Sequence, residues 1–155
     1  MAGPGIRYWE FAKQFAKYSE FRVVLLVPTS CDLVSDGIEI REYSSNNQRT
    51  IVNQTRDIDV IISQNITPLL ARSIAKRGIK YIADLYDPMI IESLEHLRYD
   101  DPRRQEYTHQ FIRQNMAFQL EYADHILCAS EQQRDFFLGI LASQGLITPA
   151  KYYRA

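Results

Sequence analysis

The chain has 155 residues, of which 46% are hydrophobic and 24% are charged, and its formal net charge is −1. This length can bury the core of one ordinary domain, and the composition is typical of a globular protein. The small charge, without a basic run or an aromatic-basic repeat, argues against nucleic-acid binding. With neither a signal-peptide pattern nor a transmembrane-length apolar run, we expect a cytoplasmic protein, in which Cys31 and Cys128 would be reduced thiols.

The N-terminal stretch is interpreted as a glycine loop that leads into an amphipathic helix. Gly3 and Gly5 flank Pro4, which suits a first helical turn because its missing N–H is not needed there. Apolar residues then recur at three- and four-residue steps, which indicates a helix with one buried face. Such loops normally follow a β-strand and turn free N–H groups toward an anionic ligand, yet no strand precedes this one. A flexible tail before a helix is the alternative.

Strand and helix patterns alternate after this first helix. Strands are expected at 21–27, 37–41, 59–64, 79–84 and 125–129, and the first of these is interpreted as buried on both faces. Helices are expected at 68–78, 88–97, about 104–122 and 131–145, and the polar segment 44–56 is expected to be a loop with a short edge strand. This alternation predicts an α/β fold, a Rossmann-like layered sheet of mostly parallel strands flanked by helices. The sheet is expected to lack its first strand.

Ligands of such sheets bind at the carboxyl ends of the strands, so residues just after strands are the candidates for a site. Asp84 and Asp87 follow one strand and could orient a substrate hydroxyl, act as a base or hold a cation. Asp87 could instead cap the helix that Pro88 opens. Ser130 follows the last strand, and its spacing to Gln133 is that of a helix capping box rather than of a nucleophile. No histidine or cysteine has metal-ligand spacing, so no metal is expected.

Three segments together resemble a known family. They are GPGIRYWEFAKQF at the N-terminus, DLYDPMIIESLEHL after the fourth expected strand, and ADHILCASEQQRDFFLGIL near the end. In this order and at these separations they resemble the N-terminal domain of family 4 (group 1) glycosyltransferases with the GT-B architecture. The resemblance covers most of residues 1–155 and implies one acceptor-side domain, without the C-terminal domain that holds most of the nucleotide-sugar.

The resemblance implies a role for particular residues. Gly3, Pro4, Gly5 and Arg7 would face the diphosphate of the donor, since backbone N–H groups and a helix dipole favour phosphate. Asp84 and Asp87 would be the catalytic residues on the acceptor side. Further substrate contacts would come from Tyr86, Ser130 and Glu131. Many members of the family carry a histidine where this chain has the Asp84–Asp87 segment, which leaves the catalytic assignment open.

The expected activity is sugar transfer from a nucleotide-sugar to an unidentified acceptor, without a metal or other cofactor, and the isolated chain is expected to be inactive. Peripheral membrane contact is open, and unpaired sheet edges would favour self-association into a homo-oligomer. A non-catalytic Rossmann-like binding or interaction domain is the alternative. A dehydrogenase nucleotide-binding domain is disfavoured because Tyr8 stands where the third glycine of G-x-G-x-x-G belongs.

Overall fold

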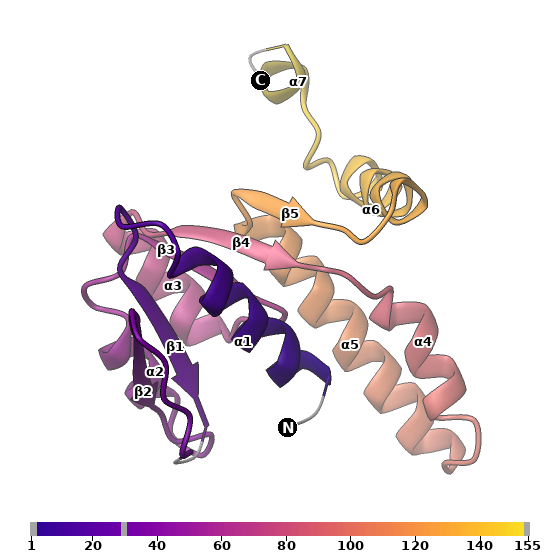
Figure 1. The fold of residues 1–155 in the computed structure, drawn as a ribbon. Coiled ribbons are helices and arrows are strands. Elements are labelled where there is room, and N and C mark those ends of the chain that lie inside the picture. The colour runs from indigo at the N-terminus through magenta and orange to yellow at the C-terminus, as the bar shows by residue number, and fades with distance from the viewer. Residues whose placement is uncertain (1–2, 29–30, 154–155) are drawn as a thin grey trace. The chain divides into compact units, whose positions relative to one another are not determined.

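The computed structural model describes residues 3–28 and 31–153, and its contacts divide the chain into two compact units (Figure 1). Unit 1 comprises Met1–Asp57 and unit 2 comprises Ile58–Ala155. In both units, parallel strands are accompanied by helices, which confirms the predicted α/β, Rossmann-like fold class. The strands of the described residues form a two-stranded sheet in unit 1 and a three-stranded sheet in unit 2.

Unit 1 contains, in chain order, α1 (Gly3–Phe15), β1 (Val23–Val27), β2 (Ile38–Glu42) and α2 (Gln48–Gln54). β1 and β2 pair in parallel, with Val23 opposite Ile38 and Val27 opposite Glu42. α1 packs against β1 and buries Ala12, whereas all five residues of β1 are only half-buried. The prediction that this strand is buried on both faces was therefore wrong.

The predicted N-terminal glycine loop is part of a helix in the structure. Gly3, Pro4 and Gly5 are exposed and form the first turn of α1. Pro4 lies in the first turn as predicted, because its fixed φ already suits a helix and its missing N–H costs no hydrogen bond there. Arg7 lies over an aromatic ring of the same helix, with its guanidinium carbon 4.6 Å from the centroid of Phe11. No described loop therefore separates these glycines from the helix.

The helix α2 was also missed, since a loop with a short edge strand was predicted there. The Asn47 side chain caps α2 by accepting a hydrogen bond from the Arg49 N–H at 3.1 Å. Arg41 of β2 stabilises its other end, because its guanidinium donates to the Gln54 carbonyl at 2.7 Å and to the Asp57 carboxylate at 2.7 and 2.9 Å. The hydrogen bonds from Arg41 and Arg22 hold the pKa of Asp57 well below its ordinary value.

The strands of unit 2 are β3 (Val60–Ser63), β4 (Lys80–Asp84) and β5 (His125–Leu127), in the parallel order β3-β4-β5 (Figure 1). Its helices are α3 (Pro68–Arg77), α4 (Met89–His96), α5 (Pro102–Tyr122), α6 (Glu131–Ser143) and α7 (Pro149–Tyr152). α3 and α5 contact each other and β4, and α4 packs beside α5. All of these except α7, which was not predicted, lie within a few residues of their predicted positions.

The core of unit 2 follows from this packing. Central β4 buries Tyr81 and Ala83 completely, and Ala71 of α3 is equally inaccessible. Leu120 of α5 and Phe137 of α6 are 3% and 2% exposed. This core fixes the strand ends and the loops that follow them. None of the helices in the described part of the chain has the length and apolar character to span a membrane.

Candidate functional site

The carboxyl ends of β3, β4 and β5 lie at one edge of the unit 2 sheet because the strands are parallel. The residues that follow these strands include Gln64 after β3, Tyr86 and Asp87 after β4, and Cys128 after β5. We call the segments 64–67, 85–88 and 128–131 the carboxyl edge. Most of the predicted site residues of unit 2 belong to it.

Asp87 is the more accessible of the two predicted catalytic carboxylates. It is half-buried, and the side-chain amide of Gln64 donates to its two oxygens at 3.2 and 3.3 Å. The alternative prediction, that Asp87 caps the following helix, was wrong. Pro88 is the N-cap residue of α4, and no side chain makes a capping hydrogen bond there. Asp87 contributes only its backbone carbonyl, which accepts from the Met89 N–H at 3.0 Å. Its carboxylate thus lies at the carboxyl edge, oriented by the amide of the residue that follows β3.

Asp84, by contrast, is fully buried at the end of β4. It pairs in register with Leu127 of β5 and lies near the thiol of Cys128. Burial raises the pKa of the Cys128 thiol above its ordinary value. The nearby charge of Arg134 lowers this pKa, and the negative charge of Asp84 raises it. The thiol is therefore protonated at neutral pH. In this arrangement the Asp84 side chain does not reach solvent.

The predicted capping box connects two strand ends. Ser130 caps α6 by accepting a hydrogen bond from the Gln133 N–H at 3.2 Å, as predicted. The Gln133 side chain in turn accepts from the Ala129 N–H at 2.8 Å and donates to the Tyr86 carbonyl at 2.8 Å. Gln133 therefore joins the loop after β4 to the start of α6. Ser130 and Glu131 are exposed beside it, and Tyr86 is half-buried.

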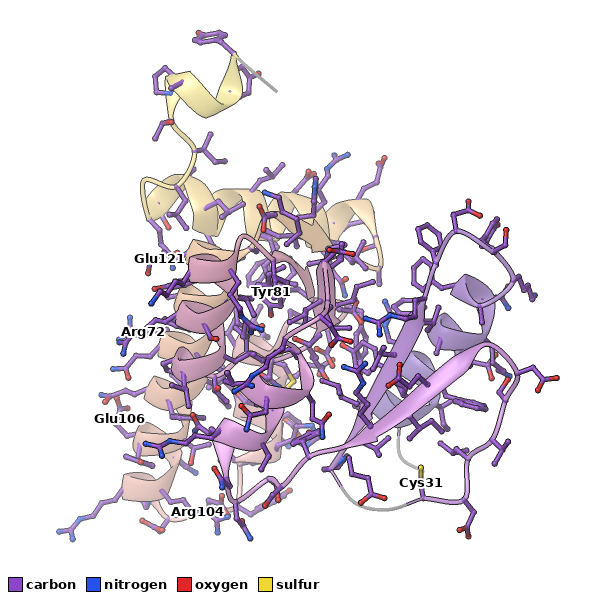
Figure 2. The ribbon with its side chains drawn as sticks, turned by 90° about the vertical axis from the view of Figure 1, so that its left-hand side faces the viewer. Cys31, Arg72, Tyr81, Arg104, Glu106 and Glu121 are labelled. Carbon is purple, nitrogen blue, oxygen red and sulfur yellow. The ribbon has the colours of Figure 1, made fainter. Side chains whose placement is uncertain are left out.

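A second set of polar groups extends from β3 to α5. The amides of Asn115 and Gln119 donate to the Asn65 side-chain oxygen at 3.0 and 3.3 Å. The Tyr81 hydroxyl lies 3.2 Å from the Gln119 oxygen and 3.3 Å from the Ser63 carbonyl. Burial raises the pKa of Tyr81 to about 12, so this phenol remains a donor. Figure 2 shows Tyr81 enclosed among the side chains of unit 2.

The remaining predicted site residues, Gly3, Pro4, Gly5 and Arg7, belong to α1 of unit 1. The structure therefore assembles the predicted residues of unit 2 at one edge and leaves those of α1 in the other unit. Gln64 and Gln133 were not predicted as site residues. The signal for Gln64 was its position as the last residue of a predicted strand, whereas its contact with Asp87 depends on a strand pairing that the sequence does not reveal.

Two cavities of unit 2 lie away from the carboxyl edge. One of about 300 Å³ lies at the opposite end of the sheet, where Gly78, Lys80 and Asp124 line it together with residues of α5. Another of about 560 Å³ lies between α5 and the segment after α6, lined in part by Phe118 and Leu146. Within residues 3–28 and 31–153 no group of His, Cys, Asp or Glu side chains is arranged to hold a metal ion.

Comparisons with known protein families, with curated proteins and with solved structures found no match for this chain. The geometry of the carboxyl edge and the resemblance of the three sequence segments are thus the two sources for a functional assignment.

Proposed function

We propose that the chain is the acceptor-side domain of a group 1 glycosyltransferase and that the carboxyl edge of unit 2 binds the acceptor. In the GT-B architecture a second domain holds most of the nucleotide-sugar, so the function proposed for these 155 residues is acceptor binding. Asp87 accepts the hydrogen bond of an acceptor hydroxyl, and Gln64 orients its carboxylate.

The observation that carries this proposal is the half-buried carboxylate of Asp87, which the Gln64 amide contacts at 3.2 and 3.3 Å. Carboxylate and amide groups match the alternating donors and acceptors of sugar hydroxyls. Tyr86 adds an aromatic side chain in the same loop, and the N-terminus of α6 adds the exposed Ser130. These groups recognise a polar, hydroxyl-rich ligand better than an apolar one.

The proposal is tested by measuring the binding of a panel of oligosaccharides and glycolipid headgroups to the chain. We expect saturable binding of at least one of them, weakened about tenfold or more by Asp87→Asn, since hydrogen bonds to charged groups are the strong ones. Asp135→Asn is the matched control, because this exposed carboxylate of α6 pairs with the guanidinium of the adjacent Arg134 and lies outside the carboxyl edge. Binding that Asp87→Asn leaves unchanged would remove the carboxyl edge from the proposal.

The burial of Asp84 favours a second candidate, a non-catalytic binding domain with the same fold. Only one of the two expected catalytic carboxylates reaches solvent in this structure. The candidates differ when the chain is joined to a nucleotide-sugar-binding GT-B domain and supplied with donors and the bound glycan. Transfer that Asp87→Asn abolishes supports the glycosyltransferase, whereas undiminished binding without transfer supports the binding domain.

A further inference from the structure

Within unit 1, one edge of the two-stranded sheet has no paired strand among the described residues. In a strand that pairs in parallel, the N–H and C=O groups of one residue point to the same side. Those of the next residue point to the opposite side. Because the Tyr43 N–H donates to the Val27 carbonyl at 2.9 Å, Val27 and Leu25 face β2. Val24 and Leu26 therefore direct their N–H and C=O groups to the opposite edge. Among the described residues, no strand other than β2 pairs with β1.

The other edge of this sheet is already partly occupied. At its beginning, the Ile38 N–H donates to the Ser35 carbonyl at 3.3 Å. At its end, the Gln54 side chain of α2 donates to the Glu42 carbonyl at 3.1 Å. β1 carries no such protection, since its sequence Val-Val-Leu-Leu-Val has no charge, proline or bulge. Its residues are also half-exposed, and a sheet of only two strands is marginal in water.

We propose that β1 is a dimerisation strand, which pairs antiparallel with β1 of a second copy of the chain about a two-fold axis at Leu25. In this register Val24 lies opposite Leu26 of the second copy, and each such pair exchanges both backbone hydrogen bonds. Leu25 lies opposite its own equivalent as a pair without mutual hydrogen bonds. The occupant is a second copy because the strand is complementary to itself in both hydrogen bonding and charge.

The charges next to the strand agree with this register. Arg22, the nearest charged residue before β1, would lie opposite Pro28 of the second copy and not opposite another arginine. Its guanidinium also has a counterion within its own unit, the Asp57 carboxylate at 2.8 Å. No like charges therefore oppose each other along the pairing. The result is a continuous four-stranded sheet of order β2-β1-β1-β2, which exceeds the size at which sheets become stable.

The register is tested by disulfide trapping. In a background with Cys31→Ser and Cys128→Ser, we expect Leu25→Cys to form a disulfide-linked dimer on mild oxidation. Opposed Cα atoms in a non-hydrogen-bonded antiparallel pair are about 4.5 Å apart, which a disulfide can bridge. Val23→Cys and Val27→Cys are the matched controls, because each would lie opposite the other position and remain unlinked alone. Equal linking at all three positions, or none at Leu25, overturns the proposed register.

Sedimentation velocity from micromolar to near-millimolar concentration tests the association itself. We expect a concentration-dependent dimer, whose dissociation constant rises about tenfold or more in Leu26→Pro, since this change removes an edge N–H but no bond to β2. Leu26→Ala controls for the lost side chain, and circular dichroism verifies that each variant folds. Only monomer in the unchanged chain overturns the proposal. If Ile61→Cys of β3 forms a disulfide-linked dimer and Leu25→Cys does not, the dimer pairs through the unit 2 sheet and the proposal is overturned. The outcome is independent of glycan binding.

Discussion

Asp124, just before β5, accepts two hydrogen bonds that differ in how easily water replaces them. One carboxylate oxygen accepts from the backbone N–H of Tyr81 at 2.9 Å, at the start of β4. The other accepts from the Lys80 ammonium at 2.7 Å, but the Lys80 side chain is 64% exposed. A solvated ion pair contributes little, whereas an unsatisfied, partly buried backbone donor is costly. At the scale of single residues, the backbone contact should therefore dominate.

We expect Asp124→Ala to lower the free energy of unfolding by about 1–2 kcal/mol, because the Tyr81 N–H loses its partner. Lys80→Ala should lower it by less than about 1 kcal/mol. Urea unfolding of both variants beside the unchanged chain measures the difference. Equal losses would mean that the ion pair, and not the backbone contact, gives Asp124 its importance.

The same residue predicts a pH dependence. Burial raises the pKa of Asp124, but the bonds from Lys80 and the Tyr81 N–H outweigh it and hold the pKa below the ordinary value of 3.8. The folded chain therefore binds this proton less readily than the unfolded chain. The stabilisation is complete above pH 3.8 and is lost as the pH falls through the lower, folded-state pKa. Unfolding in urea across this acid range should show a smaller loss for Asp124→Asn than for the unchanged chain.

At the scale of elements, two glycines provide opposite tests of backbone conformation. Gly78 ends α3 with φ +72°, a left-handed conformation that residues with a Cβ rarely adopt. Gly139 lies inside α6, and a Cβ added there would have no atom within 4 Å. Gly78→Ala should therefore destabilise the chain by about 1 kcal/mol, and Gly139→Ala should stabilise it by about 0.5–1 kcal/mol. Thermal unfolding measures both, and two shifts of the same sign would contradict the assignment.

The elements that the sequence predicted correctly have their end signals close by in the chain. Thr67 caps α3 through the Leu70 N–H, Gly78 ends it, and Ser130 caps α6. α2 was missed because part of its stabilisation comes from Arg41 of the preceding strand, which a local pattern cannot show. The prediction of the candidate site was limited in the same way. The position of Asp87 after a strand was predictable, but the bond from Gln64 requires knowledge of the strand order.

At the scale of the whole molecule, the buried apolar side chains are unevenly divided between the units. Unit 1 buries Ala12 in α1, and the five apolar residues of β1 are half-exposed. Unit 2 holds the larger buried side chains, including Tyr81 and Phe137. Because burial of apolar surface is the main stabilising contribution, the two units should differ in the free energy at which they open.

Native-state hydrogen exchange can measure this difference. At protein concentrations low enough to keep the chain monomeric, we expect the amides of β1 to exchange through openings of lower free energy than those of β4. Phe137→Ala, which truncates a side chain that is 2% exposed, should lower the opening free energy of β4 by about 3–5 kcal/mol. It should leave the exchange of β1 nearly unchanged, since contacts cluster within each unit. If β1 and β4 opened at one common free energy and shifted together in this variant, the chain would unfold as one cooperative unit.

Raising the protein concentration should slow the hydrogen exchange of Val24 and Leu26 in particular, because dimer pairing would engage their outward N–H groups.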